Sequence, residues 1–188
     1  PFAALAYFLI NRGQAYPPGP DWSKATSTQI TNQGGTEFFP SLSPDGRDVV
    51  YAAEENGQFD IFWQRIGSKR RTNLTQGSAS DDTQPVFSPN GELIAFRSER
   101  EPKGIYTIDV NGENLRHISE IGYHPSWSPD GKQLVVAMFG RDQPTVRASP
   151  GLSLQVIDVQ SKSRTDIIKA EASFPAWSPN GHRIAYWF

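Results

Sequence analysis

Cysteine is absent from this 188-residue chain, which excludes disulfide bridges, thiolate metal sites and a cysteine nucleophile. Histidine is scarce, and the three present, His117, His124 and His182, show no metal-ligand spacing. A formal net charge of −2 argues against a nucleic-acid groove, which needs a concentrated basic face. The Gly-x-Ser-x-Gly elbow of serine hydrolases is also missing. We therefore expect no cofactor, no metal, no nucleic-acid partner and no catalytic constellation within this chain.

Long apolar runs are missing too, apart from nine residues at 2–10. In a helix they would cover about half of a bilayer's hydrocarbon core, so residues 1–10 are a candidate end of a transmembrane helix. An apolar arm packed on the domain is the alternative. Few basic residues follow, which favours an extracytoplasmic, periplasmic location for the rest. Residues 11–27 include Tyr16-Pro17-Pro18-Gly19-Pro20 and are expected to form a stiff linker.

One eight-residue sequence motif, which we call the repeated phrase, occurs four times. It begins at Phe39, Gln84, His124 and Phe174, and its first copy reads Phe-Pro-Ser-Leu-Ser-Pro-Asp-Gly. The Ser-Pro-[Asp/Asn]-Gly cores start at residues 43, 88, 128 and 178, at intervals of 45, 40 and 50 residues. A period of this size indicates a repeat architecture.

Each repeat predicts four short antiparallel strands. In the third, Pro125 is expected at the first position of a strand, where its missing N–H is tolerated. Residues 128–131 then form a type I turn with a following bulge, in which Pro presets φ and Gly accepts positive φ. Further strands follow at 133–137, 152–158 and 164–168. Four strands per 40–50 residues is typical of a β-propeller blade.

The predicted fold class is all-β. We expect a propeller fragment of about three and a half four-stranded blades over residues 28–188, in which Gln29-Ile30-Thr31 has the pattern of an outermost strand. The expected blades cover residues 36–77, 82–119 and 122–169, and a fourth starts at 172–188. Four side chains at equivalent inner-strand positions are expected to be core between blades, namely Leu42, Phe87, Trp127 and Trp177.

The pattern Pro-x-[Trp/Phe]-Ser-Pro-[Asp/Asn]-Gly-x-x-[Ile/Val]-Ala-[Phe/Tyr] resembles the PD40 repeats of TolB-like propellers, and Leu74-Thr75 fits their ending. The WD40 type is excluded, because Gly-His and Trp-Asp pairs are missing at blade spacing. The resemblance covers residues 28–188. It implies six blades in a whole propeller, closure of the ring by an N-terminal outer strand, here residues 28–31, and a protein partner in the bacterial envelope.

Two functions follow from the resemblance. The first is a non-catalytic scaffold that recognises a protein, peptide or glycan. It would form the extracytoplasmic sensor or interaction part of an envelope or signalling protein, such as one with a kinase or winged-helix module. The alternative is the gating propeller of a serine peptidase similar to prolyl oligopeptidase, with its catalytic domain outside this chain.

Binding is expected on the face where loops vary between repeats. In an up-and-down blade, loops that lead into inner strands share a face with the loops between second and third strands. The Ser-Pro-[Asp/Asn]-Gly turns lie on the opposite face and are interpreted as scaffold. The candidate binding residues are Glu37, Asp81, Asp82, Tyr123 and His124, with Arg141, Asp142 and Arg147 from the long loop 138–151.

Two of these assignments have plain structural alternatives. The 138–151 loop could simply be solvated. Asp81 and Asp82 could bind a hard cation such as calcium, but flanking ligands are missing and an Asx-type turn accounts for the pair.

Overall fold

The computed structural model describes residues 21–31, 34–138, 153–169 and 172–187, and the chain divides into two units, 1–32 and 33–188. In the first unit, a short 3-10 helix (η1) spans Trp22–Lys24. The Asp21 carboxylate caps it by accepting hydrogen bonds from the amide and hydroxyl of Ser23. The second unit contains the strands.

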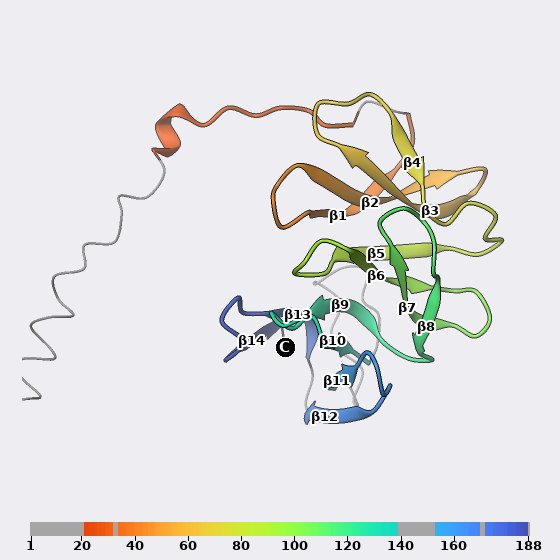
Figure 1. Ribbon diagram of the computed structural model, residues 1–188, viewed down its shortest axis with the longest axis vertical. Helices are drawn as coiled ribbons and strands as arrows, with labels where there is room; N and C mark the ends of the chain where they lie inside the picture. Colours follow the sequence, from red (N-terminus) through yellow and green to blue (C-terminus); the bar gives the residue numbers. More distant parts are fainter. Residues whose placement is uncertain (1–20, 32–33, 139–152, 170–171, 188) are drawn as a thin grey trace, which may run out of the picture. The chain divides into compact units, whose positions relative to one another are not determined.

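Antiparallel sheets make up the second unit, and within each sheet the strands lie side by side in chain order (Figure 1). The first sheet contains β1 (Glu37–Leu42), β2 (Asp48–Glu55), β3 (Gln58–Arg65) and β4 (Arg71–Asn73). The second contains β5 (Asp82–Phe87), β6 (Leu93–Ser98), β7 (Gly104–Asp109) and β8 (Arg116–Ser119). The third contains β9 (Tyr123–Trp127), β10 (Gln133–Ala137), β11 (Leu154–Asp158) and β12 (Arg164–Ile168). Two strands, β13 (Ser173–Trp177) and β14 (Ile184–Trp187), form the last. The all-β propeller prediction is confirmed, and we number these sheets as blades 1 to 4.

The first strand of each blade is the innermost. Strand β1 packs beside β5, β5 beside β9, and β9 beside β13, so these four strands run side by side. The outer strands lie progressively farther from this line, as expected for blades arranged about an axis (Figure 1).

The repeated Ser-Pro-[Asp/Asn]-Gly phrases form the turns between first and second strands, as predicted. In blade 1, the Gly46 amide donates to the Ser43 carbonyl at 2.9 Å, and Gly46 has a φ of 69°. The Ser43 hydroxyl donates to Asp45 Oδ1 at 2.7 Å and accepts the Asp48 amide at 2.9 Å. The same hydroxyl bonds recur at Ser88, Ser128 and Ser178. We call the surface that bears these turns the turn face and the opposite surface the bulge face.

Every innermost strand contains a β-bulge at its X-Pro pair. In blade 3, His124 and Pro125 together face a single residue of β10, Val136, between the aligned pairs Tyr123–Ala137 and Ser126–Val135. The prediction that Pro125 begins its strand is therefore wrong, since β9 starts at Tyr123. Proline is tolerated here because a bulge leaves its residue outside the regular hydrogen-bond ladder.

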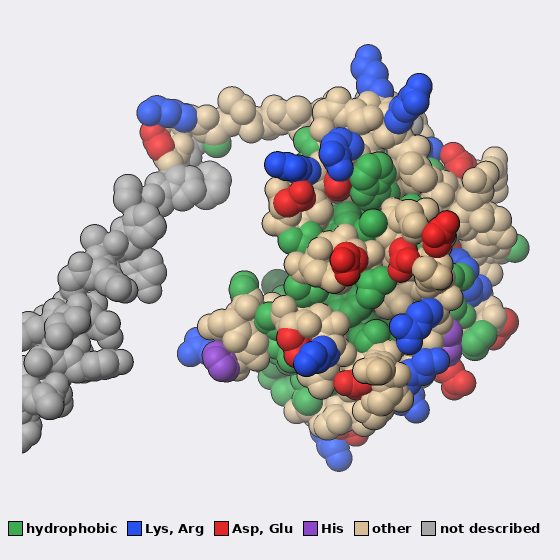
Figure 2. Space-filling model, in the orientation of Figure 1, with side chains coloured by type: hydrophobic (Ala, Val, Ile, Leu, Met, Phe, Trp, Pro, Cys, Tyr) green, Lys and Arg blue, Asp and Glu red, His purple; other side chains and the backbone are tan. Residues whose placement is uncertain are grey.

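Hydrophobic cores fill the seams between neighbouring blades. At the surface, hydrophobic side chains remain visible between the blades (Figure 2). Phe87, 7% exposed, packs on the core of blade 1, and Trp127, 6% exposed, packs on that of blade 2, as predicted. Trp177 packs against blade 3 but stays half-exposed. The prediction that Leu42 is core is wrong: it is 58% exposed, because the described residues place no sheet on the outer side of β1.

Two terminal predictions have different outcomes. Residues 28–31 form no strand, so the predicted closing strand is not observed. Such a strand needs the third strand of its blade as a partner, and the described part of blade 4 has two strands. The apolar segment 1–10 and residues 11–20 of the linker lie outside the described residues. Within the described ranges, no helix has the length and apolar character required to span a membrane.

Candidate functional site

The four bulges bring one side chain from each blade to the centre of the bulge face. The Phe39 and His124 rings lie 6.0 Å apart between centroids, and the His124 and Phe174 rings lie 4.2 Å apart. The His124 amide donates a 2.6 Å hydrogen bond to Gln84 Oε1. Since Phe39 belongs to blade 1 and His124 to blade 3, their contact reaches across blade 2, which requires a position near the axis. We call these four residues the axial cluster.

The axial cluster has an unusual backbone. Its members have φ values of 49° to 57° although none is glycine: Phe39, Gln84, His124 and Phe174. Non-glycine residues rarely adopt this conformation, which costs on the order of 1–3 kcal/mol when the surroundings impose it. Here the Pro that follows and the packing of the inner strands impose it. The result is that these side chains leave the pleat and point toward the axis instead of into a seam.

A cationic residue lies beside the axial cluster. The Arg97 guanidinium carbon sits 4.4 Å from the centroid of the Tyr123 ring, and the group pairs with Glu99 at 2.7 Å and donates to the Gly122 carbonyl at 3.3 Å. Arg97 is only 5% exposed, so these contacts replace its water shell. Lys103 pairs with Glu99 at 3.2 Å, which adds a second cation at the edge.

Asp82 lies below the surface. Its side chain is fully buried, and Oδ2 accepts a short hydrogen bond from Arg100. Burial raises the pKa of Asp82, against the lowering effects of Ser98 and Arg100. A carboxylate buried and paired in this way holds β5, β6 and the following loop together.

The remaining predicted site residues are dispersed. Glu37 is half-buried at the start of β1. Asp81 is exposed and accepts the Phe59 amide at 2.9 Å, so it bridges blade 2 to β3 of blade 1. His124 belongs to the axial cluster, and Tyr123 precedes it in β9 and contacts Arg97. Arg141, Asp142 and Arg147 lie outside the described residues, as does most of the 138–151 loop.

Sequence reasoning missed Phe39, Gln84 and Arg97. A signal for the first two was present, because both occupy the position before Pro in the repeated phrase, as His124 and Phe174 do. Interpreting Pro as the first strand residue placed this position in a loop and concealed its role. For Arg97 there was no signal, since its stacking on Tyr123 depends on how blade 2 packs against blade 3.

The chemistry of the bulge face suits recognition. The axial cluster presents the partly exposed phenyl rings of Phe39 and Phe174 beside the buried His124 and Gln84, and its edge offers the Glu99 carboxylate and the Lys103 ammonium group. Within the described ranges, no group of three or more His, Asp or Glu side chains is arranged to hold a metal ion. Aromatic side chains flanked by charged groups are typical of protein-binding surfaces.

Comparison with known proteins agrees with this fold. The TolB beta propeller domain family, PD40, matches residues 21–187. The Tol-Pal system protein TolB of Francisella tularensis subsp. tularensis (strain WY96-3418) is 33% identical over 168 residues, covering 85% of this chain and 37% of the relative. The chain thus spans little more than a third of that protein's length.

Solved structures show the same architecture. The putative TolB from Agrobacterium tumefaciens superposes with a TM-score of 0.67 at 24% identity, covering 84% of this chain and 61% of that one. A puromycin hydrolase superposes with a TM-score of 0.63 at 15% identity, covering 84% of this chain and 26% of that one. At these identities the likeness concerns the fold alone. Repeats, blades and family match together lead to one conclusion: this chain belongs to the TolB β-propeller family.

Proposed function

We propose that this chain is a non-catalytic scaffold that recognises a protein or peptide segment at the centre of its bulge face. One observation carries the proposal: side chains from all four blades converge in the axial cluster, including a contact between blades that are not neighbours. Because several blades fix these side chains before any partner arrives, binding would cost little ordering entropy.

The composition of the face favours a protein partner. Aromatic residues and arginine provide most of the binding energy at protein interfaces. Here the rings of Phe39 and Phe174 lie beside the His124 ring, and Arg97 stacks on Tyr123, the residue before His124. The family match supports the same partner class, since the Francisella relative is named as a component of a Tol-Pal system. A glycan on this face is the weaker option, because the carboxylates nearby, Asp82 and Glu99, are already paired with arginines.

We further propose an extracytoplasmic location and a role in an envelope or signalling protein, both from the family resemblance. Whether residues 1–10 anchor the protein in a membrane belongs to the same proposal.

Site-specific photocrosslinking tests the proposed face. A benzophenone amino acid placed at Phe39 or Phe174 of the full-length protein should yield a defined protein adduct in cells of the source bacterium, identified by mass spectrometry. The control position is Ile66, which is 37% exposed in the β3–β4 turn on the turn face. His124→Ala should reduce the adduct at Phe174 severalfold. Adducts that form at Ile66 but not at the axial cluster would contradict the proposal.

A further inference from the structure

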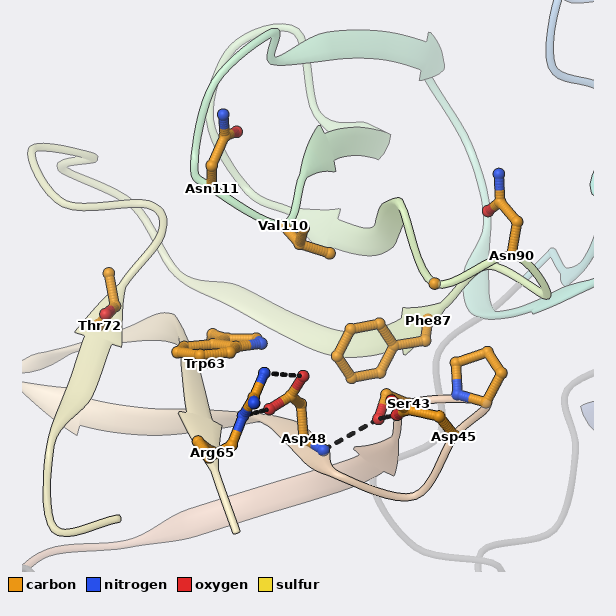
Figure 3. A pocket seen from close by; sticks show the side chains of 12 residues that line it. Ser43, Asp45, Asp48, Trp63, Arg65, Thr72, Phe87, Asn90, Val110 and Asn111 are labelled. Carbon is orange, nitrogen blue, oxygen red and sulfur yellow. Dashed lines mark hydrogen bonds and ion pairs between the residues drawn. The ribbon is translucent and has the colours of Figure 1, made fainter.

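A second concave site lies on the turn face, away from the axial cluster. A cavity of about 620 Å³ opens between blades 1 and 2, within the range usual for small-molecule sites. Trp63 of β3 and Phe87 of β5 line it side by side, with the nitrogen edge of the indole toward Phe87, and Val110 lines another side (Figure 3). Its polar lining includes Asp45, Asp48, Arg65, Thr72, Asn90 and Asn111.

Trp63 departs from the repeat. It pairs with Val50, and the corresponding pairs in the next two blades join Ala95 to Thr107 and Val135 to Val156. Thus a β-branched residue, smaller than tryptophan, occupies the equivalent position in blades 2 and 3. Blades 2 and 3 thus have no indole at this position, whereas Trp63 packs against the core between blades 1 and 2 and remains partly exposed.

The polar partners of Trp63 depart from the repeat as well. Arg65 pairs with Asp48 through two hydrogen bonds of 2.6 and 3.2 Å, and its guanidinium carbon lies 5.9 Å from the Trp63 ring centroid. At the Arg65 position, blades 2 and 3 have Asp109 and Asp158. The two-point ion pair fixes the guanidinium plane beneath the indole, so one ring face is supported while the other borders the cavity (Figure 3).

The lining of the cavity has both hydrogen-bond donors and hydrogen-bond acceptors that a ligand could use. The Trp63 Nε1–H, which points toward Phe87, and Arg65 Nη1 donate to no side chain or backbone group in the described part of the chain. Asp48 accepts through both oxygens but has lone pairs left. Hydrogen bonds from the Ser43 hydroxyl and the Arg47 amide lower the pKa of Asp45, so this side chain is an acceptor at neutral pH.

A ligand for this cavity needs an apolar face to lie on an indole and a rim that both donates and accepts hydrogen bonds. Sugars combine these properties: their C–H groups meet the negative face of an aromatic ring, and each hydroxyl donates and accepts. The charges oppose a polyanion, because two carboxylates accompany one guanidinium. A proline-rich peptide offers almost only hydrogen-bond acceptors, because proline has no backbone N–H. It would therefore give the Asp45 and Asp48 carboxylates no hydrogen-bond donor. We propose that the cavity between Trp63 and Phe87 binds a neutral saccharide of one or two rings.

The test is ligand-observed saturation-transfer NMR on the full chain. The probes are maltose, cellobiose and N,N′-diacetylchitobiose, with digalacturonate as an anionic comparison and a proline-rich decapeptide as a peptide comparison. At least one neutral disaccharide should bind saturably, and Trp63→Leu should weaken its binding at least tenfold. The matched control is Trp187→Leu, which removes an indole that is 63% exposed on β14 and should leave binding unchanged.

A second variant separates binding from folding. Thr72 is exposed on β4, so Thr72→Ala should leave the melting temperature unchanged. The variant should bind the disaccharide severalfold more weakly, because the contact of the Thr72 hydroxyl with the sugar is lost. The proposal is overturned if no neutral disaccharide binds, if digalacturonate or the peptide binds in their place, or if the folded Trp63→Leu variant binds as well as the wild type.

Discussion

The backbone amide of His124 donates a 2.6 Å hydrogen bond to the side-chain oxygen of Gln84, forty positions earlier in the chain. Both residues occupy the bulge before Pro in their own blade, and both are buried. The bond therefore ties the inner strands of blades 2 and 3 together at the axis. It also fixes the backbone of His124 in its left-handed conformation.

Replacing this acceptor should destabilise the fold. Gln84→Ala removes the side-chain oxygen that accepts the hydrogen bond of the buried His124 amide, and the loss of a buried hydrogen bond of this kind costs about 1–3 kcal/mol. Urea denaturation monitored by circular dichroism measures the loss. Gln160→Ala, at an exposed turn position, is the control and should change stability by less than about 0.5 kcal/mol. Equal losses in the two variants would show that the bond contributes nothing specific.

The serine of the repeated turn should matter more in an inner blade than in the last one. Ser88, 2% exposed, donates to Asn90 at 2.7 Å and accepts the Leu93 amide at 2.9 Å. Ser178 makes the same two bonds in blade 4, where the groups are exposed to water. Ser88→Ala should cost about 1–2 kcal/mol and Ser178→Ala distinctly less, because water replaces the lost bonds at the second site. Thermal denaturation of both variants checks the order, and the reverse order would contradict it.

Gly104 should not tolerate any side chain. Its φ is 144°, and a Cβ atom there would lie 1.7 Å from the Ser119 carbonyl oxygen of β8. Gly104→Ala must therefore push β7 and β8 apart, and we expect a loss above about 4 kcal/mol or a failure to fold. At Gly112, with a φ of 85°, the nearest atom would lie 3.7 Å away, so Gly112→Ala should cost only about 1 kcal/mol of backbone strain. Expression level and melting temperature distinguish the two variants.

Asp82 should make stability depend on pH in the acidic range. The folded-state pKa of Asp82 is raised by burial, whereas an unfolded Asp titrates at about 3.9. Between these two values the folded state binds more protons than the unfolded state, so stability falls as pH rises through this window. Asp82→Asn removes this pH-dependent contribution to the free energy of unfolding. The stability difference, wild type minus variant, should thus decrease as pH rises from about 3.9 and level off above the folded-state pKa.

A companion variant tests the cause. The Arg100 guanidinium opposes the raised pKa of Asp82, so Arg100→Gln should move the levelling point to higher pH. Denaturant titrations at half-unit pH steps measure both effects. A stability difference that does not change with pH would exclude Asp82 as the titrating group.

Local chemistry was predictable from sequence where a turn depends on its own residues. The Ser-Pro-[Asp/Asn]-Gly phrase closes its hairpin with bonds between residues two to five positions apart, and β12 spans Arg164–Ile168 as predicted. Alternating and β-branched segments between the turns then predicted four strands per blade. Four copies of one phrase were enough to indicate a propeller.

Contacts between blades could not be predicted in the same way. The axial cluster joins Phe39 to His124 across 85 positions, and the cavity joins Trp63 to Phe87 across the seam of two blades. Both arrangements depend on how far each blade rotates against the next. That rotation is decided by the summed packing of side chains such as Ile61 and Phe96, which no short sequence window contains.

Sequence alone determined the blade, because its turns and strands rest on interactions between near neighbours in the chain. The tertiary structure decided what the blades make together: a bulge that turns a residue before Pro toward the axis, a buried Asp82 in place of a surface ligand, and an exposed Leu42 at a blade edge. The physical reason is that these interactions differ in their range along the chain. Hydrogen bonds of a turn act within a few residues, whereas burial depends on every segment that packs nearby.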